Sequence, residues 1–147
     1  MSVKSLLLHP TSRAVANLKS TLLQTFDRSE GLLSKDNNFA VATALATYTH
    51  SKDLAIAQKN VAEHSKEGKE QVGFDFAIAE ECQLEKECKS YTDVYDNLVF
   101  EIEYTDNEDA DAVFQAACDD HGSTIAIVYR DRNTVPAGEA DYHYEQC

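Results

Sequence analysis

The sequence of 147 residues is short of basic side chains, with 13 Lys and Arg against 26 Asp and Glu and a formal net charge of −13. Proteins that bind nucleic acid or an anionic membrane surface do so largely by neutralising phosphate, so this balance argues against both as partners. A run of 18 apolar residues is also missing, and no segment is predicted to span a membrane. An acidic surface suits a neutral or cationic ligand instead.

The N-terminal segment has no apolar run of the length that a secretory signal needs. Only Leu6, Leu7 and Leu8 are consecutive there, before His9 and Pro10. A signal peptide contains an apolar stretch of roughly 7–15 residues. The sequence as given therefore predicts no secretory signal.

The cysteines form no Cys-x-x-Cys pair, which disfavours zinc, and we predict no metal site. The second half of the chain holds all four, namely Cys82, Cys88, Cys118 and Cys147. An even number favours disulfides, and four buried or free thiols are the alternative. Disulfides belong to oxidising compartments, so the cysteines and the N-terminus point to different locations.

The first third of the chain has the three- and four-residue spacing of apolar side chains that predicts helices. The first such series is Ala14, Val15, Leu18, Leu22 and Phe26. A second helix is predicted to begin after Ser34 or Asp36. Its apolar stripe is Phe39, Ala42, Leu45 and Thr49. Val3–Leu8 is compatible with a short strand.

From residue 53 onwards, short apolar runs alternate with helix-sized polar connections. The predicted strands are Leu54–Gln58, Phe74–Ala79, Leu98–Tyr104 and Thr124–Tyr129. The predicted helices are Val61–Gln71 on the surface, Lys86–Tyr95 and Glu108–Asp120, the last ending in a left-handed Gly122. This alternation indicates βα units with a parallel sheet in a single domain. The tail after Arg130 is predicted to be irregular.

Polar residues stand at the carboxyl end of each of the four predicted strands. They are Lys59-Asn60, Glu80-Glu81, Glu103-Tyr104 and Arg130-Asp131. Ligands of parallel α/β sheets bind at the carboxyl ends of the strands. Acids, an amide, a lysine and an aromatic ring together suit a sugar site. The alternative is that these residues only mark where each strand reaches the surface.

Glu80 is the candidate catalytic residue of this set. It ends the apolar run FAIA, so we expect partial desolvation to raise its pKa, with Glu81 and Glu103 acting in the same direction. A carboxyl group that stays protonated near neutrality can donate a proton to a glycosidic oxygen. Glu81 is expected to point away from the opening of the site that Glu80 faces, because side chains alternate along a strand. The alternative is a solvated Glu80 paired with Lys59.

The run FDFAIAEECQLEKEC (Phe74–Cys88) resembles a segment of glycoside hydrolase family 114, the endo-α-1,4-polygalactosaminidases, which reads FDFAxNEqC and has another Cys six positions after the first. Further pieces are similar to this family in the same order. They are LAIAQKN (Leu54–Asn60), LVFEIEY (Leu98–Tyr104), FQAAC (Phe114–Cys118), GSTIAIVYRD (Gly122–Asp131) and the terminal Cys147. The resemblance covers about residues 30–147.

The resemblance implies an α/β fold, a partial (β/α)8 TIM barrel consisting of its C-terminal half, with parallel strands and flanking helices. A whole barrel needs ~250 residues. We therefore expect residues 1–147 to form one domain of this family, truncated on its N-terminal side. The family resemblance also implies a secreted, extracellular protein.

The same resemblance implies a glycosidase acting on α-1,4-linked polysaccharide that contains galactosamine or galactose, by two-carboxylate acid/base chemistry and without a cofactor. Glu80 falls on the family's acid/base glutamate. Sugar-contacting positions fall on Lys59, Asn60, Glu103 and Tyr104. The implied disulfides are Cys82–Cys88 and Cys118–Cys147.

Two departures from the family pattern leave other functions open. Ala79 stands where the family has Asn, and the motif DGxxxDNxD, which supplies the second catalytic carboxylate, is not found. The acid nearest to its place is Asp27. The alternatives are a non-catalytic carbohydrate-binding remnant and a small doubly wound α/β interaction module, the latter favoured if Asp27 and Lys59 meet at a switch point of the sheet.

Overall fold

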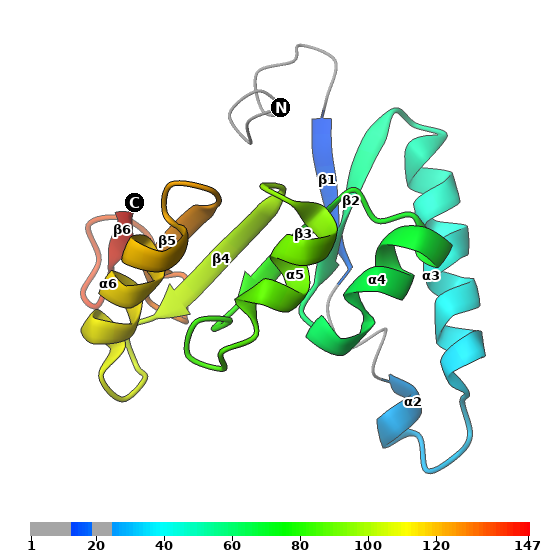
Figure 1. Cartoon of the computed structure of the whole chain (residues 1–147), viewed down its shortest axis with the longest axis horizontal. Coiled ribbons are helices and arrows are strands. Elements are labelled where there is room, and N and C mark those ends of the chain that lie inside the picture. Colours follow the sequence, from blue (N-terminus) through cyan, green and yellow to red (C-terminus); the bar gives the residue numbers. More distant parts are fainter. Residues whose placement is uncertain (1–12, 19–24) are drawn as a thin grey trace.

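The computed structural model describes residues 13–18 and 25–147, which form one six-stranded sheet (Figure 1). The strands are β1 (Arg13–Leu18), β2 (Leu54–Lys59), β3 (Phe76–Glu80), β4 (Val99–Tyr104), β5 (Ala126–Arg130) and β6 (Tyr144–Gln146). They lie side by side in chain order, β1 to β5 parallel and β6 antiparallel to β5. The four predicted strands are confirmed, as are their order and their parallel pairing.

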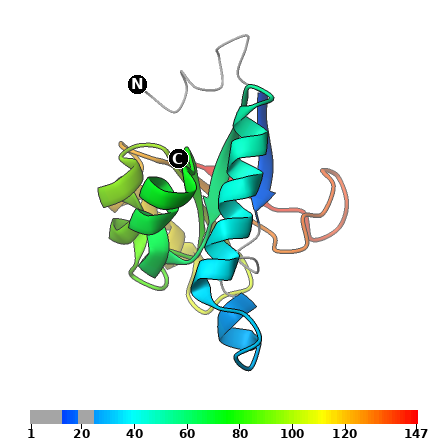
Figure 2. The ribbon, with the colours of Figure 1, turned by 90° about the vertical axis from the view of Figure 1, so that its right-hand side faces the viewer.

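The long helices all cover the same face of the sheet (Figure 2). The helices are α2 (Thr25–Arg28), α3 (Lys35–His50), α4 (Ser65–Glu67), α5 (Cys88–Tyr95) and α6 (Ala110–His121), with a 3-10 turn at Ala62–His64 and a π turn at Gly68–Val72. Packing runs α3 on β2, α5 on β3 and β4, and α6 on β4 and β5. None of the helices in this described part is long and apolar enough to cross a membrane.

This arrangement confirms the partial barrel and argues against the doubly wound module. A doubly wound sheet has helices on both faces and a point where the strand order reverses. Here β1 to β5 follow one another without a reversal, and their connecting helices lie on one side, as in a barrel wall. The core between helices and sheet is built from alternate strand residues such as Ile56, Ala77, Val99 and Ile127.

The predicted first helix is wrong at its start, because Arg13–Leu18 is a strand, whereas Phe26 at its end does lie in a helix, α2. A short apolar run is ambiguous by spacing alone, and pairing decides. β1 hydrogen-bonds to β2 and so satisfies backbone groups of β2 that would otherwise form a bare edge of the sheet. The predicted strand at Val3–Leu8 lies outside the described residues.

The predicted helix after Ser34 is confirmed, and Ser34 is its N-cap. The Ser34 hydroxyl accepts from the Asn37 amide at 3.2 Å, and the Asn37 side chain accepts from the Ser34 amide at 3.0 Å. This reciprocal capping fixes where α3 begins. The buried stripe of α3 contains Ala46 in place of the predicted Leu45, which is 40% exposed.

The segment 61–71 is not the exposed helix that its polar composition predicts. It forms three short turns, and Ser65, Gly68 and Val72 are buried. A Cβ at Gly68 would lie 2.3 Å from Oε1 of Gln58, so only glycine lets this turn approach the buried glutamine. The unusual turn is thus a consequence of packing around one polar side chain of β2.

Two disulfides join the second half of the chain, as predicted. They are Cys82–Cys88 and Cys118–Cys147. The second ties the end of the chain to α6 beside β6, a strand that the expected irregular tail did not include. Gly122 is right-handed, with φ −59°, so the predicted left-handed stop of α6 is wrong.

Candidate active site

Three of the predicted site residues lie on one face of the sheet at the carboxyl ends of neighbouring strands. Lys59 pairs with Ile78, two residues before Glu80, and Glu80 pairs with Ile102, two residues before Tyr104. Side chains two residues apart share a face. Lys59, Glu80 and Tyr104 therefore step along one edge, on the face opposite the helices.

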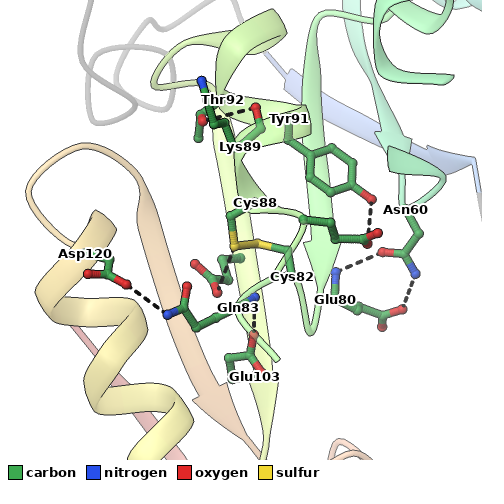
Figure 3. The surroundings of a disulfide bond; sticks show 12 residues. Asn60, Glu80, Cys82, Gln83, Cys88, Lys89, Tyr91, Thr92, Glu103 and Asp120 are labelled. Atoms are coloured by element: carbon green, nitrogen blue, oxygen red, sulfur yellow. Dashed lines mark hydrogen bonds between the residues drawn. A yellow bond between two sulfur atoms is a disulfide. The ribbon is translucent and has the colours of Figure 1, made fainter. Parts of the chain in front are cut away.

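The Glu80 carboxylate is the centre of this cluster. Oε2 accepts hydrogen bonds from Nζ of Lys59 and, at 2.9 Å, from Nδ2 of Asn60. Oε1 accepts from the Tyr104 hydroxyl. The Asn60 side-chain oxygen in turn accepts from the Glu80 amide at 2.8 Å, so the two residues bind reciprocally (Figure 3). Four of the five predicted acid/base and sugar-contacting residues meet here.

Asn60 is placed by a buried glutamine that sequence reasoning missed. Gln58 is fully buried, and its side-chain nitrogen donates to the carbonyls of Asn60 at 2.9 Å and Val61 at 3.0 Å. Both residues have left-handed backbones, with φ 57° and 66°. The Tyr95 hydroxyl donates to Oε1 of Gln58 at 2.8 Å and fixes the amide. The signal in the sequence is a lone amide within the apolar run of β2.

The pKa of Glu80 is lowered, which overturns the predicted rise. Burial by itself raises this pKa, but hydrogen bonds from Lys59, Tyr104 and Asn60 and the charge of Lys59 outweigh it. The three hydrogen bonds and the Lys59 charge all favour the ionised form of Glu80. Glu80 is therefore a carboxylate near neutrality, suited to act as a base. To act as an acid it must first take up a proton.

Glu81 does not point away from its neighbours, because the strand alternation stops at Glu80. Glu81 has a left-handed backbone, with φ 61°. Its Oε1 accepts from Nη2 of Arg132 and from Nδ2 of Asn107, both at 2.7 Å. The Arg132 hydrogen bond is the main reason that the pKa of Glu81 is lowered. The expected orientation of Glu81 is thus wrong.

Glu103 does not join the cluster, because it faces the helices. It precedes Tyr104, so alternation turns it to the other side of β4, where it is 1% exposed. Its Oε1 accepts a hydrogen bond from the backbone N–H of Gln83 at 3.1 Å (Figure 3). Glu101 lies on the same face, 3.5 Å from Sγ of Cys88. The expectation that Glu103 shares an opening with Lys59 and Glu80 is wrong.

Burial raises the pKa of both inward-facing glutamates, that of Glu101 to about 8. One carboxylate oxygen of each, Oε2, is buried without a hydrogen-bond partner among the described residues. A proton on one carboxyl group would be donated to the other and satisfy both. We therefore assign this pair to structure rather than to the candidate site.

Asp27, the sequence candidate for a second carboxylate, is exposed on α2, which packs against α3 (Figure 1). The contacts of the Glu80 carboxylate come from Lys59, Asn60 and Tyr104 instead.

A group of three potential metal ligands among the described residues is Cys82, Cys88 and Glu101, whose ligand atoms lie within 4.8 Å of one another. The two sulfur atoms are bonded to each other, so they offer no thiolate to a metal.

The parallel strands form a wall of the kind found in α/β barrels. At its carboxyl edge lie a carboxylate, a lysine, an amide and a phenol, which is where such barrels bind ligands. These features define the class of the protein as an α/β-barrel protein. Comparison with known proteins makes the class specific. The sequence profile of glycoside-hydrolase family GH114 matches residues 17–147, and the chain belongs to this family.

A solved structure with the same fold is that of Aspergillus fumigatus Ega3, in complex with galactosamine. The two structures agree with a TM-score of 0.66 at 23% sequence identity. The match covers 93% of this chain and 54% of Ega3, so the chain spans about half the length of that protein. A search of curated protein sequences finds no match.

Proposed function

We propose that this chain binds α-1,4-linked, galactosamine-containing polysaccharide at the carboxyl edge of its sheet and supplies Glu80 as an acid/base carboxylate for hydrolysis. The observation that carries the proposal is the set of three donors on Glu80, from Lys59, Asn60 and Tyr104. Family membership supports a glycosidase or a carbohydrate-binding protein. The galactosamine bound to Ega3 supports an amino-sugar ligand.

In a retaining reaction Glu80 would first give a proton to the leaving glycosidic oxygen as an acid and then take one from water as a base. In an inverting reaction it would perform only one of these two steps, and the second carboxylate would perform the other. The hydrogen bonds that Glu80 now accepts favour the base form. A substrate hydroxyl group that accepts a hydrogen bond from Lys59 or Tyr104 would release the carboxylate and let it be protonated. The net charge of −13 would draw a cationic galactosamine chain towards the site.

Hydrolysis also needs a second carboxylate, about 5–5.5 Å away for retention or 6.5–9.5 Å for inversion of configuration. Glu81 is engaged by Arg132 and Asn107, and Glu103 is buried on the other face. This favours the second candidate function, which is carbohydrate binding without cleavage. In both cases we propose an extracellular protein, because two disulfides suit an oxidising compartment.

The test measures binding and cleavage separately, with α-1,4-galactosamine oligosaccharides as the probe. If the chain cleaves them, Glu80→Gln should lower the cleavage rate by about 10²–10⁴-fold, because the amide cannot transfer a proton as an acid does. Binding, followed by calorimetry, should change little. Glu70→Gln is the matched control, since it makes the same chemical change at an exposed position.

Three outcomes separate the proposals. Cleavage that survives Glu80→Gln removes the acid/base assignment. Binding by the parent chain without any product supports the carbohydrate-binding function. A parent chain that neither binds nor cleaves the oligosaccharides contradicts both.

A further inference from the structure

Arg132 connects the ends of three strands beside the candidate site. It lies just after β5, and its guanidinium is stacked on the Tyr104 ring, with Cζ 4.2 Å from the ring centroid. Its Nε donates to Asp106 at 2.8 Å, and its Nη2 donates to Asp106 at 2.9 Å and to Glu81 at 2.7 Å. The planar fork is thus fixed on two sides by carboxylates that follow β4 and β3.

Tyr104 is held at both ends by these contacts. Its ring lies under Arg132, and its hydroxyl donates to Oε1 of Glu80. The residue is buried, and Arg132 lies over one face of its ring. A chain of contacts therefore runs from the exposed Asp106 through Arg132 and Tyr104 to the Glu80 carboxylate.

We propose that Arg132 is a positioning residue that holds the Tyr104 hydroxyl against Glu80. The inference rests on the proposed function, because the position of the Tyr104 hydroxyl matters for catalysis only if Glu80 is the acid/base group. The contact itself is independent of whether the chain cleaves a polysaccharide. Arginine suits the task better than lysine, because its flat guanidinium can stack on a ring while its edge binds a carboxylate.

The consequence is that Arg132 acts on Glu80 through Tyr104 rather than through its own charge. Among the causes that lower the pKa of Glu80 against the effect of burial, the Tyr104 hydrogen bond comes directly after that of Lys59. Arg132 itself already compensates Asp106 and Glu81, with which it forms ion pairs. Releasing Tyr104 should therefore raise the pKa of Glu80.

The experiment follows the Glu80 carboxyl carbon by NMR during a pH titration of the whole chain. Tyr104→Phe should raise the pKa of Glu80 by about one unit, the usual scale of a hydrogen bond to a charged group. Arg132→Met should raise it by a similar amount. Adding Arg132→Met to Tyr104→Phe should produce little further change, because the hydroxyl through which Arg132 acts is already gone.

Two more variants keep the test decisive if Arg132→Met does not fold. Arg132→Lys retains the charge but loses the planar fork, and should still raise the pKa of Glu80. Asp106→Asn leaves Arg132 in place and loosens it at an exposed position, and should give a smaller rise. Arg130→Met is the control for lost charge. Arg130 pairs with Tyr104 in the sheet, but its guanidinium donates to Asp131, so this variant should leave the pKa of Glu80 unchanged.

Two results would overturn the proposal. The first is an equal shift from Arg132→Met with and without Tyr104→Phe, which would mean that Arg132 acts by charge alone. The second is no shift in any of the Arg132 and Asp106 variants. Neither result depends on cleavage, so a chain that binds without hydrolysing still gives a clear answer.

Discussion

The two glutamate pairs of neighbouring strands have the same chemistry and opposite environments. Glu80 ends β3 and Glu81 follows it, and each contacts a cationic side chain, Lys59 or Arg132 respectively. Glu101 and Glu103 lie on β4 between sheet and helices, with no cationic partner among the described residues. The first pair has lowered pKa values and the second has raised ones. Burial favours the protonated form of a carboxyl group, and a nearby cation favours the ionised form.

The two pairs should therefore give stability opposite dependences on pH. A folded pKa above the unfolded one contributes stability that is lost as pH rises through the folded value, here between about 4.5 and 8 for Glu101. A folded pKa below the unfolded one contributes stability that is lost as pH falls, which applies to Glu80 and Glu81. The alkaline and the acid limbs of the stability profile thus belong to different strands.

The largest expected effect comes from Glu101→Gln. In the pH range where Glu101 is protonated in the folded state but ionised in the unfolded state, the unfolding free energy of the parent should fall by up to about 1.4 kcal/mol per pH unit. The amide cannot ionise, so the part of this slope that Glu101 contributes should disappear between pH 5 and 8, while Glu103 keeps its own contribution. Urea unfolding at a series of pH values measures it. Glu70→Gln should keep the parental slope, and an unchanged slope in Glu101→Gln would contradict the assignment of the alkaline limb.

A smaller effect is expected from Lys59→Met, which removes the cation from Glu80 and leaves a partly desolvated carboxylate. We expect a loss of about 1–2 kcal/mol at pH 7, below the cost of breaking a fully buried pair. The loss should shrink as the pH falls and Glu80 takes up a proton. Lys59→Met in a Glu80→Gln background should cost much less. Equal losses in both backgrounds would mean that Lys59 stabilises the fold without Glu80.

The same comparison shows how far sequence reasoning reaches into the site. Lys59, Asn60, Glu80 and Tyr104 could be predicted together, because parallel strands bring their carboxyl ends to one edge. Glu103 was placed with them by its position at a strand end, although alternation puts it opposite Tyr104. The direction of the Glu80 pKa could not be predicted, since it depends on the contact with Lys59 across two strands.

The fold shows the same division between local pattern and distant contact. The strands from β2 to β5 follow from apolar runs with polar connections, and Ser34 marks the start of α3. β1 could not be separated from a helix, because only pairing with β2 makes Arg13–Leu18 a strand. The turns of 61–72 likewise depend on the buried Gln58, whose side chain is fixed by Tyr95, 37 residues further along the chain.

The smallest effect is expected from Glu81→Gln, which makes the same chemical change as Glu101→Gln on the other pair. The amide oxygen can still accept from Arg132 and Asn107, and Arg132 keeps its bonds to Asp106. Arg132 is 41% exposed and Glu81 24%, so solvent partly screens the ion pair that is lost. The unfolding free energy should change by less than about 0.5 kcal/mol at pH 7. Below pH 4.5 the unfolding free energy should depend slightly less on pH than in the parent. Between pH 5 and 8 its slope should equal that of the parent. Urea unfolding of Glu81→Gln beside Glu101→Gln tests this contrast directly, and a Glu81→Gln variant that flattens the alkaline limb would show that the two pairs titrate as one group.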